Sequence, residues 1–237
     1  MRLSLLAVLA AVVGLTVIGC TSESSPAPDN GTHSTAPAPA AQQPTGTQLK
    51  GLLAPASFFP AGYAPLAAGT ADSHDQFQTQ TTPAPPKPDC ALLGGTGWFT
   101  ITGLNTGKDS VSFAQAAYLD DATKTEQDQQ VFAYSGTGAT TQLAAVGKLG
   151  KLCPSYTDSA THSKVKVTEH ATSGLGDGGY TITLTDTAWK SGSTLAAVRV
   201  GNVDAFVYST GGPADGATDA TKLSTYLVKQ LKALPKS

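Results

Sequence analysis

The chain is poor in charged residues. Asp, Glu, Lys and Arg make up 14% of its 237 residues, whereas about a quarter is usual in soluble domains. The 15 basic residues are balanced by 17 acidic ones, and the formal net charge is −2. Because nucleic-acid binding depends on clustered Lys and Arg, this composition excludes nucleic acid as a partner. The length suits one globular domain with appendages rather than a two-domain enzyme.

Motifs of familiar catalytic and metal sites are also scarce. The sequence contains no G-x-S-x-G and no H-E-x-x-H, which disfavours two common hydrolase classes. His162 and His170 bracket a predicted strand, and a straight strand of that length would separate them by about 26 Å, too far to share a metal ion. We therefore expect no cofactor, no metal site and no enzymatic activity. A catalytic triad assembled from distant residues would leave no trace in sequence order, so an envelope hydrolase stays an alternative.

One glycine-rich stretch matches a dinucleotide-binding motif in its residue types but not in its predicted structural context. Residues 174–179 read GLGDGG, a literal G-x-G-x-x-G. The motif binds pyrophosphate only where it follows a strand and opens a helix. Here the alternating run YTITLTDTAW follows, which predicts a strand. We interpret the stretch as a tight turn with several positive φ angles, in which Asp177 accepts backbone N–H bonds.

The N-terminus has the pattern of an export signal. Arg2 precedes an apolar run at residues 3–18, which is shorter than the roughly 20 residues of a membrane-spanning helix. Residues 17–20, VIGC, resemble the lipobox of bacterial lipoproteins. We expect residues 1–19 to be a signal peptide and the Cys20 thiol to carry lipid, which anchors the protein at the extracytoplasmic face of the cell membrane. A short apolar anchor that stays attached is the alternative.

A linker separates this anchor from the globular part. The residues after Cys20 are rich in Pro, Ser, Thr and Ala and show no hydrophobic periodicity. Such a segment cannot bury enough apolar surface to offset the entropy of ordering it. We assign residues 20–48 to the lipidated cysteine and a disordered tether, and residues 49–237 to a single domain.

Hydrophobic patterns in the domain predict an α+β fold. Alternating runs indicate strands, and apolar residues at helical spacing indicate two main helices. The predicted strands are 110–119, 129–135, 164–170, 180–189, 194–200 and 203–210, and the predicted helices are 138–152 and 219–234. We expect an antiparallel sheet of about five to six strands with the two helices packed on one face. Gly201 and Asn202 mark the turn of the last hairpin.

Two cysteines are left once Cys20 is lipidated. Cys90 and Cys153 would lie in an oxidising compartment, where a disulfide between them is expected. A catalytic or redox thiol is less well supported, because neither cysteine belongs to a Cys-x-x-Cys pair.

Three residues are candidates for a ligand cleft. Trp98 and Trp189 could offer aromatic faces to a sugar or lipid, although packing in the core is the more ordinary role of tryptophan. Arg199 is the only arginine after Arg2. It lies in a predicted strand between two valines and would point toward solvent or a groove, with a buried ion pair as the alternative.

The order of segments resembles a known family. LLAPASFFPAGY, PPKPDCALLG, LGKLC, GLGDGGYTITL and AAVRVGNVDAFVYS follow one another and precede a C-terminal amphipathic helix. This order is similar to the actinobacterial extracytoplasmic sensor-like domains, which occur as free lipoproteins and as the extracellular part of receptor Ser/Thr kinases of the PknH type. The resemblance covers residues 49–234. It implies a sheet flanked by helices, a cleft suited to a ligand, and no established catalysis.

From these observations we expect a membrane-anchored, extracytoplasmic, sensor-like lipoprotein. Its partners would be the membrane, through the N-terminal lipid, and a small molecule, a lipid, a cell-wall ligand or an envelope protein. A structural envelope lipoprotein without a ligand is a further alternative. The sequence does not indicate the oligomeric state.

The lipid anchor can be tested by replacing its attachment residue. Cys20→Ala removes the only thiol of the lipobox, so the variant should leave the membrane fraction and its processing should no longer respond to globomycin. Cell fractionation followed by immunoblotting measures both effects. An unchanged membrane fraction would contradict the anchor.

Overall fold

The computed structural model describes residues 43–79, 82–95, 98–103, 109–189, 192–211 and 213–234. These residues belong to one compact unit, Pro39–Ser237. The predicted signal peptide and the lipidation site at Cys20 lie outside the described residues. No helix within the described ranges is both long enough and apolar enough to span a membrane.

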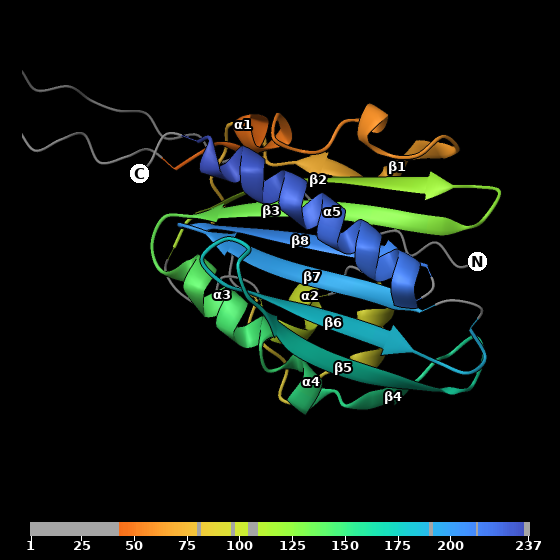
Figure 1. The fold of residues 1–237 in the computed structure, drawn as a ribbon. Coiled ribbons are helices and arrows are strands. Elements are labelled where there is room, and N and C mark those ends of the chain that lie inside the picture. The colour runs from red at the N-terminus through yellow and green to blue at the C-terminus, as the bar shows by residue number, and fades with distance from the viewer. Residues whose placement is uncertain are drawn as a thin grey trace, which may run out of the picture. The chain divides into compact units, whose positions relative to one another are not determined.

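One antiparallel sheet of eight strands forms the centre of the domain (Figure 1). Its spatial order is β1-β2-β3-β8-β7-β6-β5-β4. The bounds are β1 Tyr63–Asp72, β2 Val111–Asp120, β3 Thr125–Tyr134, β4 Ser155–Thr157, β5 Lys164–Thr172, β6 Gly179–Thr185, β7 Ser193–Val200 and β8 Val203–Thr210. The prediction of five to six strands is therefore wrong. The six predicted strands all form, and two more join them.

The two missed strands are the edges of the sheet. β1 is mostly exposed, contains Pro65 and Gly69, and shifts register against β2 between Leu66 and Ala71. β4 is only three residues long. Edge strands of this kind are short, bulged or solvent-facing. They therefore lack the alternation of buried and exposed residues by which a strand is recognised in sequence.

Helices cover both faces of the sheet, which corrects the expectation of two helices on one face. The helices are α1 Gly46–Lys50, α2 Trp98–Thr102, α3 Gly138–Val146, α4 Leu149–Leu152 and α5 Pro213–Lys232, with short 3-10 turns at Ala56–Phe58 and Cys90–Gly94. In Figure 1, α5 crosses β7 and β8 on the near face, whereas α2 lies behind the sheet.

Alternating residues of the central strands supply two separate cores. Leu195 and Ala197 of β7 pack in a cluster with α2, α3 and α4, whereas Ala196 packs in a second cluster with α1 and α5. Six consecutive residues of β7 are buried. A strand that is buried on both sides requires cover on both sides, and this is why one layer of helices is not enough.

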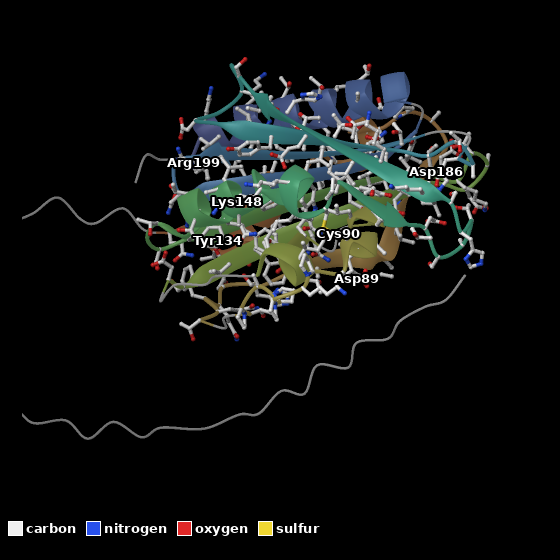
Figure 2. The ribbon with its side chains drawn as sticks, turned by 90° about the horizontal axis from the view of Figure 1, so that it is seen from below. Asp89, Cys90, Tyr134, Lys148, Asp186 and Arg199 are labelled. Atoms are coloured by element: carbon white, nitrogen blue, oxygen red, sulfur yellow. A yellow bond between two sulfur atoms is a disulfide. The ribbon has the colours of Figure 1, made fainter. Side chains whose placement is uncertain are left out.

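The predicted disulfide is confirmed. Cys90 and Cys153 are joined, with their Cα atoms 5.5 Å apart. Cys90 begins the 3-10 turn Cys90–Gly94, and Cys153 follows the last residue of α4. The bond thus ties the long β1–β2 connection to the segment that leads into β4 (Figure 2).

The start of the described chain is hydrogen-bonded to the sheet. The side-chain amide of Gln43 donates from Nε2 to the backbone carbonyl oxygens of Ser110 and Ala133, at 3.1 and 2.8 Å. The Ser112 hydroxyl donates to the Pro44 carbonyl oxygen at 2.5 Å. Residues 43–48, which the sequence assigns to the tether, therefore belong to the folded domain in the structure.

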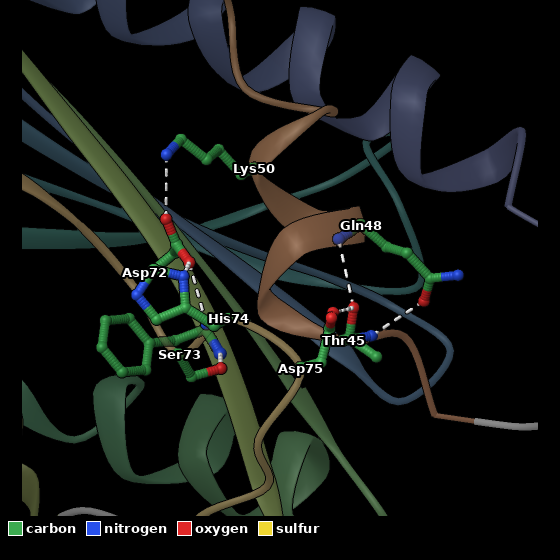
Figure 3. A network of polar contacts seen from close by, with 8 residues as sticks. Thr45, Gln48, Lys50, Asp72, Ser73, His74 and Asp75 are labelled. Atoms are coloured by element: carbon green, nitrogen blue, oxygen red, sulfur yellow. Dashed lines mark hydrogen bonds and ion pairs between the residues drawn. The ribbon is translucent and has the colours of Figure 1, made fainter.

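A second polar network holds α1 against the end of β1 (Figure 3). The Asp72 carboxylate contacts Lys50 Nζ at 3.0 Å and His74 Nδ1 at 2.9 Å. The hydrogen bond from Lys50, followed by that from the His74 amide, holds the pKa of Asp72 below its usual value. Thr45 caps α1 through the Gln48 amide, and its hydroxyl donates to Asp75 at 3.0 Å. The polar contacts of α1 thus fix the N-terminal segment in place.

Removing the disulfide should destabilise the domain. It closes a loop with a sequence separation of 63 residues, and the chain-entropy relation gives about 4 kcal/mol for a loop of that length. The double variant Cys90→Ser/Cys153→Ser should therefore lose about 4 kcal/mol of unfolding free energy and melt roughly 10 °C lower. Calorimetry measures the difference. Equal melting temperatures, or two free thiols by mass analysis of the non-reduced wild type, would contradict it.

Candidate functional site

A groove of about 350 Å³ opens between α3 and the glycine-rich turn. It lies on the face of the sheet that carries α3. Its lining combines one side of the helix, the end of β5, the turn and the start of β6, and Arg199 of β7. The residues are Thr140, Leu143, Ala144, Ala171, Thr172, Asp177, Gly178, Gly179, Tyr180 and Arg199. The volume is within the range of small-molecule sites.

The glycine-rich turn is fixed against the end of β7, and it contains the positive φ angles predicted for it. Gly174, Gly176 and Gly178 have φ of 77°, 63° and 146°. A Cβ on Gly176 would lie 2.3 Å from the Arg199 carbonyl oxygen, so the turn could not approach β7 with another residue there. The Asp177 amide donates to the Arg199 carbonyl at 2.7 Å, and the Arg199 amide donates to the Gly178 carbonyl at 2.9 Å.

This arrangement places a carboxylate beside a guanidinium in the groove. Asp177 Oδ2 and Arg199 Nη1 are 3.8 Å apart, and their side chains are 48% and 23% exposed. Gly201 orients both groups: its N–H donates to Asp177 Oδ2 at 2.6 Å, and its carbonyl accepts Arg199 Nη1 at 2.8 Å. The pair is therefore positioned by the backbone of the β7–β8 turn rather than by direct hydrogen bonding.

The opposite side of the groove is apolar. Leu143 and Ala144 face it from α3, and Tyr180 faces it from β6. Gly147 allows the end of α3 to rest on the phenol, because a Cβ there would lie 2.2 Å from Tyr180 Cζ. The close approach of Gly147 thus fixes the position of the Tyr180 ring, which lines the groove.

A buried carboxylate lies next to Arg199 in the sheet. Asp204 of β8 is paired with Arg199 in the β-ladder, is 0% exposed, and has two carboxylate oxygens without a hydrogen-bond partner among the described residues. Burial raises the pKa of Asp204 well above its usual value, although Arg199 acts in the opposite direction. Burial, followed by the charge of Asp204, also raises the pKa of the buried Tyr134 hydroxyl. Burial therefore favours the neutral form of Asp204 over its carboxylate form.

The predicted cleft residues are not brought together, and only Arg199 lines the groove. Trp98 is 1% exposed and packs on Phe206, so it belongs to the core. Trp189 lies in the turn before β7 and packs partly against the same core. About six residues of extended strand, roughly 20 Å, separate the start of β7 from Arg199. Figure 2 shows Arg199 and Asp186, which precedes Trp189, toward opposite ends of the molecule.

In the described part of the chain, the histidine side chain that contacts a carboxylate is His74, at 2.9 Å from Asp72. His162 and His170 are exposed, and neither side chain is hydrogen-bonded to a serine or a carboxylate there. Ser73 lies between Asp72 and His74 in sequence, but its buried hydroxyl accepts the Phe113 amide at 3.1 Å. Across the described ranges, no three His, Cys, Asp or Glu side chains gather as metal ligands.

Sequence reasoning missed a second buried carboxylate. β3 begins at Thr125, and Asp128 within it is 7% exposed. Burial, followed by the charge of Glu126, raises the pKa of Asp128 to about 8. A polar residue followed by more polar residues gives no sequence signal of burial. Neither Asp128 nor Asp204 could be recognised as a core residue from composition.

Comparison with known proteins shows the fold. No protein-family model matches the sequence, and neither does any curated protein. The structure is similar to the crystal structure of the extracellular domain of PknH from Mycobacterium tuberculosis, with a TM-score of 0.52 and 15% sequence identity. The match covers 81% of this chain and 98% of that one. At this identity the likeness establishes the fold that the segment order predicts, a sheet flanked by helices.

Asp204 should make the stability of the domain depend on pH. Its raised folded-state pKa favours the folded state below the unfolded-state pKa, and this contribution is lost as the pH rises toward the folded-state value. Asp204→Asn removes the titration. The variant should therefore gain unfolding free energy relative to the wild type as the pH rises from 4 to 8, by at most about 1.4 kcal/mol per pH unit.

Urea unfolding at a series of pH values measures this difference. Thr194→Val is a matched control, because Thr194 is also buried without a hydrogen-bond partner in the described structure but does not titrate in this range. Its difference from the wild type should be constant with pH. Parallel curves for Asp204→Asn and the wild type would refute the assignment.

Proposed function

We propose that the protein is a lipid-anchored, extracytoplasmic, sensor-like module that binds a ligand in the groove between α3 and the glycine-rich turn. The observation that carries the proposal is the fold shared with an extracellular receptor-kinase domain over 98% of that domain. The lipobox at residues 17–20 and the export pattern before it support the same location.

Two structural features support it further. The disulfide between Cys90 and Cys153 is of the kind that forms in oxidising compartments outside the cytoplasm. The groove combines an apolar wall with a few oriented polar groups, which is the composition of small-ligand sites. Both features are consistent with recognition, and neither requires a catalytic role.

A melting-temperature screen with a groove-blocking variant tests the proposal. The full-length protein is heated with lipids, muropeptides or sugars, and a ligand present at 100 times its Kd should raise the melting temperature by about 5–10 °C. Ala144→Trp places a bulky ring in the groove and should abolish the shift. Thr225→Trp adds the same ring at an exposed position of α5, on the other face of the sheet, and should preserve it.

The outcomes separate binding from a structural role. A shift that Ala144→Trp removes and Thr225→Trp retains supports recognition in the groove. No shift with any class of compound would contradict it and favour a structural envelope protein. An equal shift in both variants would also contradict it, because the ligand would then bind outside the groove.

A further inference from the structure

The groove contains a hydrogen-bond donor whose capacity is largely unused. Arginine has five N–H donors and no acceptor. Among the described residues, the Arg199 side chain makes one hydrogen bond, from Nη1 to the Gly201 carbonyl. Its neighbour Asp177 is acceptor-only and half exposed, and it receives one hydrogen bond from the Gly201 amide. Both groups can therefore bind a further partner while they stay in place.

The charges of this pair disfavour an ionic ligand. Asp177 and Arg199 lie 3.8 Å apart and carry opposite charges, so their net charge is zero. An anion that reached the guanidinium would meet the Asp177 carboxylate, and a cation that reached Asp177 would meet Arg199. A fixed hydrogen-bond donor beside a fixed acceptor is matched by a neutral molecule that has an acceptor and a donor on adjacent atoms.

The apolar wall defines the rest of the ligand. Leu143 and Ala144 of α3 line the groove together with Tyr180, whose phenol lies against the end of α3 at Gly147. Thr140 of α3 also lines the groove. A sugar ring has this combination of surfaces, because its C–H face is apolar and its edge carries adjacent hydroxyls that each donate and accept. Aromatic and aliphatic side chains bind the first surface, and charged hydrogen-bonding groups bind the second.

We propose that the groove binds a neutral saccharide through one pair of adjacent hydroxyls. Arg199 donates to the oxygen of one hydroxyl, and Asp177 accepts the hydrogen of the next, while the C–H face of the ring packs on Tyr180 and Leu143. This inference rests on the proposed function and names the class of ligand. The two backbone hydrogen bonds between the glycine-rich turn and β7 fix the spacing of both groups before the ligand arrives.

Saturation-transfer NMR tests the proposal with defined probes. The full-length protein is prepared in a detergent without a sugar headgroup and mixed with the methyl glycosides of glucose, mannose, galactose and arabinose. At least one of them should receive saturation at its ring C–H protons. Asp177→Asn and Arg199→Lys should each weaken that binding by about tenfold or more, because each removes a charge-assisted or fork-shaped contact.

These substitutions preserve the local fold. An Asn at position 177 can still accept the Gly201 amide, and a Lys at position 199 keeps the charge. Lys166→Gln, at an exposed site of β5 outside the groove, is the matched control and should bind like the wild type. Melting temperatures verify that each variant is folded.

Two results would overturn the proposal. The first is the absence of saturation transfer to all four sugars in the folded wild type, or unchanged transfer in both groove variants. The second is binding of methyl phosphate that Asp177→Asn strengthens, because that result identifies an anion site. A ligand found by the melting screen that is not a sugar, and that Ala144→Trp excludes, would leave the proposed function standing while this inference fails.

Discussion

The pairing of β3 with β8 is the contact on which the rest of the domain depends. The first three strands form one meander, and β4 to β8 form another that starts at the far edge of the sheet. The two meet only where β3 and β8 pair, from Gln127 opposite Ser209 to Ala133 opposite Val203. Both cores are built on this seam, and the β7–β8 turn that orients Arg199 and Asp177 is an extension of it. The chain must complete the segment from Tyr134 to Val203, about 70 residues, before β3 and β8 can pair, so the fold is dominated by long-range contacts.

This seam carries an unusual number of polar groups for the centre of a sheet. Asp128 and Gln130 of β3 and Asp204 of β8 are buried, and each has a side-chain oxygen without a hydrogen-bond partner in the described structure. Buried polar groups of this kind oppose folding unless they are neutral or find a partner. Burial raises the pKa of Asp128 and Asp204, and the protonated form of each carboxyl group costs less free energy to bury than the charged form. Burial of the large apolar surface on both faces of the same strands, including Val131, Phe132 and Phe206, offsets the remaining cost of burying the polar groups.

The sequence predicts the inner part of the fold better than its borders. The strands β5, β7 and β8 form close to their predicted bounds, whereas β6 ends at Thr185, before the end of the predicted strand 180–189. The Gly201–Asn202 turn and the Cys90–Cys153 bond are as expected. β1 and β4 could not be recognised, because an edge strand needs no buried face. The second layer of helices was missed for the opposite reason: β7 and β8 are buried on both sides, and a run of buried residues does not show which face each helix covers.

The candidate site could likewise be predicted only in part. Arg199 was recognisable as a cleft candidate from its local setting, a lone arginine in a strand, whereas the sequence assigned Asp177 only to the glycine-rich turn. The groove itself depends on where α3 lies relative to the turn, which only the tertiary structure shows. Trp98 illustrates the limit of residue type as a guide, because a tryptophan in a short helix can fill a core as readily as it can line a cleft. The paired donor and acceptor, rather than an aromatic residue, define the chemistry of the groove.

The attachment of residues 43–50 to the sheet has a mechanical consequence. A pull on the chain at Gln43 acts first on its hydrogen bonds to Ser110 and Ala133, and then on the Thr45–Asp75 and Lys50–Asp72 contacts. Gly46 packs so closely that a Cβ there would lie 2.5 Å from Ser73 Oγ, which leaves little slack between these contacts. Tension applied at the N-terminal side therefore passes along a series of contacts, and it reaches β2 and β3 before it can pull the edge strand β1 away.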